Sequence, residues 1–195
     1  MKKFTIILAA IFVFGLVFSS CAKPPTEEMN KAHDAVIRAE NDADAVTYAG
    51  STLLRARDAL ARMQSEADAK RYDAAKNFAA EAVAAAEKAI EDGKTGAARA
   101  RDEAANLVNS LSGPLAETSN ALDAARQVKN LNLNLNLDSL SGDLDLARQT
   151  YDRARQNLAA NNYKEAITNG QNVRSTLAGI NARLTEAAQA VSRKQ

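Results

Sequence analysis

The chain is poor in the residue types that build catalytic and metal sites, with one cysteine, one histidine and no tryptophan in 195 residues. Cys21, being alone, cannot form a disulfide within the chain. Cys21 and His33 are also too few for a His/Cys metal cage or for Cys–His catalysis. No Gly-x-Ser-x-Gly elbow and no glycine-rich phosphate loop is present. We therefore predict no enzymatic activity, no metal site and no cofactor, and we expect His33 to be a solvated surface residue.

Aromatic residues make up only 5% of the chain, and the net charge is close to zero, at +1. Four of the five phenylalanines lie within the first 18 residues. Binding to nucleic acid requires a basic surface stripe or aromatic platforms on which bases stack. The composition therefore argues against a nucleic-acid partner.

The first twenty residues have the layout of a secretory signal peptide. Lys2 and Lys3 precede an uncharged apolar run over residues 4–18. Crossing a bilayer takes about 20 apolar residues, so this run is too short to be a membrane span. We predict that residues 1–20 are a signal peptide and that the protein is exported.

The residues around Cys21 resemble the lipobox of bacterial lipoproteins, because Cys21 directly follows the apolar run and two serines. The resemblance implies cleavage before Cys21, acylation of its thiol and amino group, and anchoring in a membrane by residues 21–26. More than one acyl chain gives stable attachment. Ala22 resembles the sorting signal for the outer membrane. Alternatively, cleavage after Ala22 would release a soluble periplasmic protein.

Alanine is abundant, with 42 residues, and it has the best helix propensity of all residue types. Apolar residues recur in steps of three and four over 27–69, which predicts one helix there, bent near Gly50. At 1.5 Å per residue, this helix would be roughly 65 Å long. A second row of apolar residues with this spacing, which we call a seam, begins at Tyr72. Gly93 and Gly96 lower the helix propensity within it.

The last seam, over residues 170–191, is the most regular and also fits a coiled-coil oligomer. We predict an all-α fold, an elongated antiparallel bundle of long alanine-rich helix hairpins. A first helical segment would cover 27–129, and a second hairpin over 143–192 would pack on it.

Two parts of the chain align at an offset of 91 residues. Ala56-Arg57 and Tyr72 then match Ala147-Arg148 and Tyr163. Both copies predict a helix, a tight polar turn, a tyrosine and a second helix, with the tyrosine packed at the turn. The alternatives are a duplicated hairpin and a chance alignment of two alanine-rich sequences.

Residues 130–137 read NLNLNLNL, a two-residue alternation typical of an extended strand. We assign 130–142 to a linker between the two helical segments. Its leucines either cover a groove of the bundle or form an edge on which a partner docks. The candidate docking residues are Leu131, Leu133, Leu135 and Leu137.

Residues 48–56 (YAGSTLLRA) and 72–75 (YDAA) resemble motifs of a bacterial domain of unknown function, number 4398. The resemblance covers roughly residues 30–95 and departs at Gly50, where that family has proline. Such domains occur in small lipoproteins and in envelope proteins joined to peptidoglycan-binding modules. The resemblance therefore implies envelope proteins or peptidoglycan-associated proteins as partners.

These observations predict a non-enzymatic envelope lipoprotein that serves as a scaffold or an interaction adaptor. The alternative is a periplasmic helical module that binds a peptide or a small ligand. A closed apolar seam between the helices would favour the scaffold, and a wide cleft with converging polar groups would favour the ligand binder.

Overall fold

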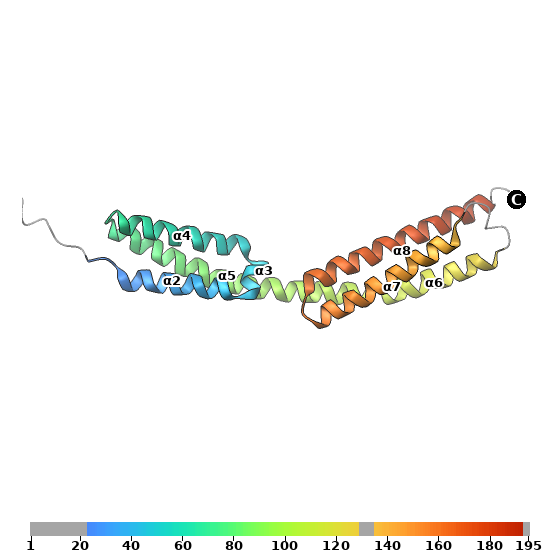
Figure 1. Ribbon diagram of the computed structural model, residues 1–195, viewed down its shortest axis with the longest axis horizontal. Coiled ribbons are helices and arrows are strands. Elements are labelled where there is room, and N and C mark those ends of the chain that lie inside the picture. Colours follow the sequence, from blue (N-terminus) through green and yellow to red (C-terminus); the bar gives the residue numbers. More distant parts are fainter. Residues whose placement is uncertain (1–22, 129–134, 193–195) are drawn as a thin grey trace, which may run out of the picture. The chain divides into compact units, whose positions relative to one another are not determined.

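The computed structural model describes residues 23–128 and 135–192. In these two ranges the chain forms seven α-helices and no β-strand, which confirms the predicted all-α fold (Figure 1). The helices are α2 (Thr26–Asn41), α3 (Ala43–Tyr48), α4 (Gly50–Asp68), α5 (Tyr72–Ser110), α6 (Ser112–Gln127), α7 (Leu137–Ala159) and α8 (Tyr163–Ser192).

The chain divides into two compact units, and the division falls between Lys94 and Thr95, inside α5. This differs from the predicted segments, because α6 packs against α7 and α8 in the second unit and is not grouped with the helices before it. In addition, α7 begins at Leu137, within the range 130–142 that the sequence pattern assigned to a linker.

The prediction of one helix over residues 27–69 is wrong, because this stretch forms α2, α3 and α4. Asp42 has an extended backbone (ψ 114°), and its carboxylate accepts a hydrogen bond from the Ala45 amide at 2.8 Å. Aspartate is a favoured helix N-cap, so Asp42 ends α2 and starts α3. Ala49 (φ −121°, ψ 31°) then separates α3 from α4. The chain turns back here, and α2 and α4 pack against each other.

The core of the first unit lies between α2, α4 and the first half of α5. Most of its members are alanines, and only a few larger residues are fully enclosed. The larger buried residues are Val36, Leu53 and Met63. Small side chains let the helices approach closely.

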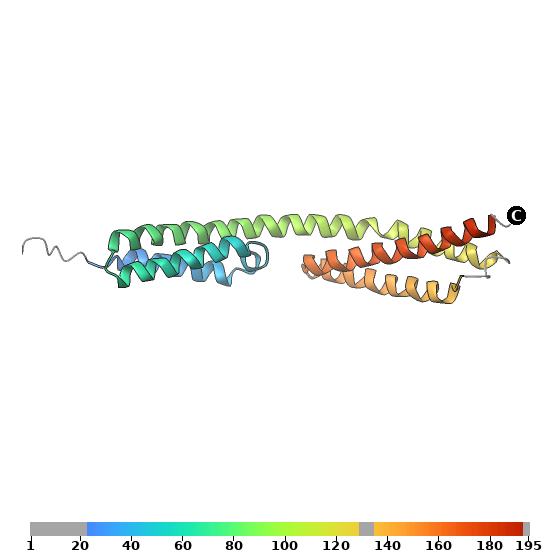
Figure 2. The same cartoon turned by 90° about the horizontal axis from the view of Figure 1, so that it is seen from above.

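Helix α5 runs without a break for 39 residues, although Gly93 and Gly96 lie inside it (Figure 2). A glycine in a helix interior costs about 1 kcal/mol relative to alanine. Gly93 has a packing reason for its place, because a Cβ atom there would lie 2.5 Å from the Ala45 backbone nitrogen. The missing side chain therefore allows α3 to lie directly on α5.

The core of the second unit lies between α6, α7, α8 and the end of α5. It contains more large aliphatic residues than the first core, among them Leu111, Leu122 and Ile180. Among the described residues, Thr118 is the one polar side chain that is fully enclosed, and its hydroxyl accepts a hydrogen bond from the Asn181 side-chain amide at 3.0 Å. A buried polar group is tolerated when it is hydrogen-bonded in this way.

The turns of the α4–α5 and α7–α8 hairpins have the same geometry at the predicted offset of 91 residues. Lys70 (φ 59°) and Asn161 (φ 63°) both adopt the left-handed conformation. In each turn the three amides that follow the first helix donate to equivalent carbonyls, as from Arg71 to Glu66 and from Asn162 to Asn157, both at 2.8 Å. Tyr72 and Tyr163 are both half-buried at the start of the following helix.

The likeness of the units extends to a third helix, which the 91-residue alignment did not include. At an offset of 86 residues, α2 matches α6. Both helices end with the same backbone hydrogen bond, which the residue after the helix donates to the carbonyl three residues earlier. Asp42 donates to the Ala39 carbonyl at 3.4 Å, and Val128 donates to the Ala125 carbonyl at 3.3 Å. Each unit therefore has the same three-helix plan.

Candidate functional site

The predicted lipidation site, Cys21, lies outside the described residues, as do Leu131 and Leu133 of the candidate docking segment. The other two leucines of that segment are described. Leu135 and Leu137 are half-buried and pack against the core of the second unit. The partner-docking role of the segment stays a prediction.

His33 is exposed on α2, as expected for a surface imidazole. Among the described residues, no three His, Cys, Asp or Glu side chains are grouped so that they could hold a metal ion. No helix in residues 23–128 or 135–192 combines the length and the apolar character that a membrane crossing needs.

A groove of about 280 Å³ lies between α4 and α5 in the first unit. Its lining includes two alanines of α5, the exposed Ala84 and the buried Ala85. Polar side chains from both helices complete the lining. They are Ser51, Thr52 and Arg55 from α4, and Glu81 and Lys88 from α5. Small-molecule sites usually enclose about 300–1,000 Å³, so the groove suits only a small ligand.

Ion pairs occupy both ends of the groove. At one end, Arg55 donates from Nε (3.2 Å) and Nη2 (2.9 Å) to one carboxylate oxygen of Glu81. At the other end, Lys88 Nζ donates to Asp92 Oδ1 at 2.9 Å, and the Thr52 hydroxyl donates to Asp92 Oδ2 at 3.0 Å. Polar groups from α4 and α5 therefore meet across the hairpin.

The hydrogen bonds from Lys88 and Thr52 hold the pKa of the Asp92 carboxyl below its ordinary value. Because the pKa is lower in the folded chain than in the unfolded chain, ionised Asp92 stabilises the fold. This contribution is complete above the unfolded-state pKa and is lost as the pH falls through the folded-state pKa.

We expect a titration of the side-chain carboxyl signals by NMR to show a midpoint for Asp92 below that of an ordinary aspartate. Lys88→Gln should raise this midpoint more than Thr52→Val does, since the bond from Lys88 is the larger cause. Thr52→Ser keeps the hydroxyl and should leave the midpoint in place. An unchanged midpoint in both Lys88→Gln and Thr52→Val would show that neither bond exists in solution.

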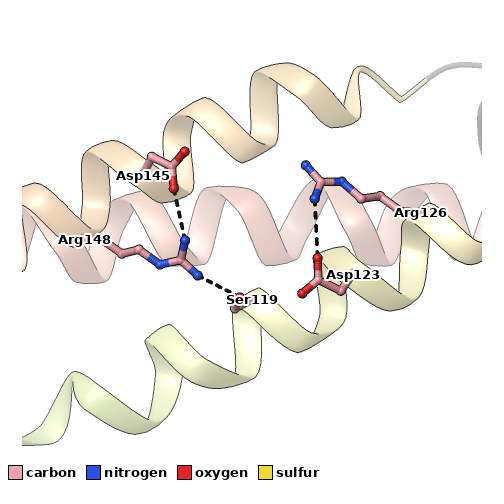
Figure 3. A network of polar contacts seen from close by, with 5 residues as sticks. All are labelled: Ser119, Asp123, Arg126, Asp145 and Arg148. Carbon is pink, nitrogen blue, oxygen red and sulfur yellow. Dashed lines mark hydrogen bonds and ion pairs between the residues drawn. The ribbon is translucent and has the colours of Figure 1, made fainter.

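A second group of polar contacts lies on α6 and α7 of the second unit (Figure 3). Arg148 donates to Asp145 at 3.0 Å and to the Ser119 hydroxyl at 2.8 Å, so it joins the two helices. Arg126 donates to Asp123 at 3.4 Å, within α6. These side chains are largely exposed, and such pairs contribute only about 0–1 kcal/mol each.

The first unit has a contact of the same kind at the matching place. Arg57, which aligns with Arg148, donates to Glu40 of α2 at 2.6 Å. Both units therefore use one arginine to tie the second helix to the first. This shared contact serves the three-helix plan and does not distinguish the units.

Sequence reasoning did not single out the groove residues. Arg55 and Glu81 are 26 residues apart, and each is an ordinary surface residue of an amphipathic helix. The alignment at 91 residues held a usable signal, because these charged positions match uncharged residues in the second hairpin. The matching residues are Leu146 and Asn172.

The fold and the groove define a helical-bundle protein of two three-helix units. Residues 27–105 match the family model of a domain of unknown function (DUF4398), which confirms the resemblance seen in residues 48–56 and 72–75. The matched range contains α2, α3, α4 and most of α5. We found no match to the chain among curated proteins and none among solved structures.

Proposed function

We propose that this protein is a non-enzymatic lipoprotein of the bacterial cell envelope, anchored through Cys21, in which the helical units act as a scaffold or interaction adaptor. The proposed site is the outer membrane, and the proposed partners are envelope or peptidoglycan-associated proteins. Three observations support it: the lipobox-like residues before Cys21, the match to the domain of unknown function, and the two well-packed helical units.

The observation that carries the scaffold role is the packing between the helices. The inner faces of α2, α4 and α5 are lined by alanines that are almost completely enclosed, including Ala32, Ala56 and Ala82, each at 0% exposure. Gly93 brings α3 into direct backbone contact with α5. Interiors packed this closely resist deformation, which suits a protein that presents surfaces to partners.

The experiment that tests the anchor is intact-mass analysis of the protein from its native membrane fraction, combined with detergent partitioning. We expect a chain that begins at Cys21, carries the added mass of acyl chains and enters the detergent phase. A Cys21→Ser variant should lose both the added mass and the detergent partitioning. A water-soluble chain that begins at Lys23 would contradict the anchor and would favour a free periplasmic protein.

A second candidate function is a helical module that binds a peptide or a small ligand. The groove between α4 and α5 favours it, because polar side chains from two helices line it together with Ala84 and Ala85. The groove is small, so this function requires a small ligand.

A further inference from the structure

The start of α2 and the α4–α5 turn lie at the same end of the first unit (Figure 2). Lys76 Nζ, in the first turn of α5, is 3.9 Å from Glu28 Oε1, in the first turn of α2. We call this end, formed by residues 23–31 and 66–76, the turn end. Helix α3 lies at the other end of α2, which at 16 residues and 1.5 Å per residue is about 24 Å away.

The chain between Cys21 and the packed first unit is short. Pro25 is already buried, and the Met29 amide donates to its carbonyl at 3.0 Å. The Thr26 amide donates to the Pro24 carbonyl at 2.8 Å. Pro25 therefore belongs to the packed unit. The four peptide steps from Cys21 to Pro25 span at most about 14 Å even when fully extended.

This short connection matters if Cys21 carries acyl chains. The acyl chains would lie in the hydrocarbon core and the cysteine backbone in the headgroup layer, which is about 5–8 Å thick on each side of a bilayer. A reach of at most about 14 Å then keeps Pro25 at or just beyond the headgroups. Packed helices lie about 8–10 Å apart, so the α4–α5 turn comes to the same surface as the start of α2.

The long sides of the first unit are less suited to the membrane than its turn end. A structure that lies flat in the interface inserts a broad apolar face. Among the described residues of this unit, the exposed large hydrophobic side chains are Ile37, Val46 and Leu54, each on a different helix. The other large apolar residues of α2, α4 and α5 pack in or against their common core. The unit therefore gains little by lying flat.

Electrostatic attraction does not explain a contact at the turn end, because its charges balance. Residues 23–31 and 66–76 contain five Lys or Arg and five Asp or Glu. Some of them pair with each other, as Lys31 does with Glu27 at 2.7 Å and Arg71 with Glu66. The contact would follow from the anchor alone, so it should not weaken when salt screens surface charges.

We propose that the turn end of the first unit rests on the lipid headgroups of the membrane that holds Cys21, with the α4–α5 turn against the bilayer surface. This inference rests on the proposed lipid anchor and adds the surface of the chain that faces the membrane. Helix α3 then stands about 24 Å farther from the headgroups, on the side that is open to envelope partners.

The test places one fluorophore at either end of the first unit. Ala69→Cys lies in the α4–α5 turn and Ala43→Cys begins α3, and both alanines are exposed. Acylated Cys21 has no free thiol, so the added cysteine alone is labelled. The lipidated chain is placed in phosphatidylcholine vesicles whose headgroups partly carry a nitroxide quencher. Because position 43 is about 24 Å farther away, we expect at least about threefold stronger quenching at position 69.

The failure of the anchor and the failure of this inference give different results. A mature chain without acyl mass would contradict the anchor, and the inference would fall with it. Equal quenching at both positions of an acylated chain would mean that the unit lies flat. Stronger quenching at position 43 would mean that α3 faces the membrane. No quenching at either position would mean that the unit stands away from it. Each of these three results would overturn the inference and leave the anchor in place.

Lengthening the tether tests whether the anchor imposes the contact. Twelve Gly and Ser residues inserted between Lys23 and Pro24 would add an average reach of about 19 Å. We expect quenching at position 69 to fall at least about twofold, because the turn end can then leave the surface. Unchanged quenching, or quenching of the original chain that disappears at high salt, would show that the turn binds lipid by itself and would overturn the inference.

Discussion

Replacing Gly93 with alanine is expected to destabilise the first unit by about 2 kcal/mol, despite alanine's better helix propensity. The new Cβ atom would lie 2.5 Å from the nitrogen and 2.7 Å from the Cα atom of Ala45. Because both are backbone atoms, no side-chain rotation relieves the clash, and α3 must move away from α5. Urea unfolding followed by circular dichroism measures the change.

Gly179→Ala is the matched control for this prediction. Gly179 is exposed on α8, and a Cβ atom there meets nothing within 4 Å. The same substitution should therefore stabilise the protein by about 0.5–1 kcal/mol through helix propensity alone. If both variants changed the free energy of unfolding with the same sign, the close contact between α3 and α5 would be contradicted.

Leu122→Ala is expected to destabilise the second unit by about 3 kcal/mol. Leu122 is 2% exposed and lies on α6 in the core formed with α7 and α8. Truncation removes apolar contacts and leaves a cavity that neighbouring helices fill only in part. Thermal unfolding gives the loss, and faster hydrogen exchange of the α6 amides would locate it.

The control for this prediction is Leu146→Ala on α7. Leu146 is 54% exposed, so its truncation should change the free energy of unfolding by no more than about 0.5 kcal/mol. Similar losses in Leu122→Ala and Leu146→Ala would mean either that α6 does not pack as described or that Leu146 is buried in solution by another molecule.

The apolar spacing in the sequence predicted the buried face of a helix correctly where the whole helix packs against a single core. The spacing of Val173, Leu177 and Ile180 predicted the buried face of α8, and all three are enclosed. The same reasoning failed at the corner between α2 and α4. Val46 continues the three-four pattern, but it is 51% exposed because Asp42 ends the helix before it.

The continuity of α5 also could not be foreseen from local rules. Gly93 lowers helix propensity, and the sequence does not show whether a neighbour packs against the missing side chain. That neighbour is the backbone of Ala45, which lies 48 residues earlier in the chain. The sequence also does not show that α6 belongs to the second unit. Its apolar face could pack against any helical core, and only the tertiary structure shows which helices it contacts.

The sequence by itself determined the all-α class, the two hairpins and their offset of 91 residues, because helix propensity and apolar spacing are local properties. It also contains the signal-peptide-like residues 1–20 and the lipobox-like context of Cys21. Only the tertiary structure decided where α2 turns into α4, which helices share a core, and that Arg55 meets Glu81 beside Lys88. These features depend on which helices pack side by side, and a local pattern does not encode its partner.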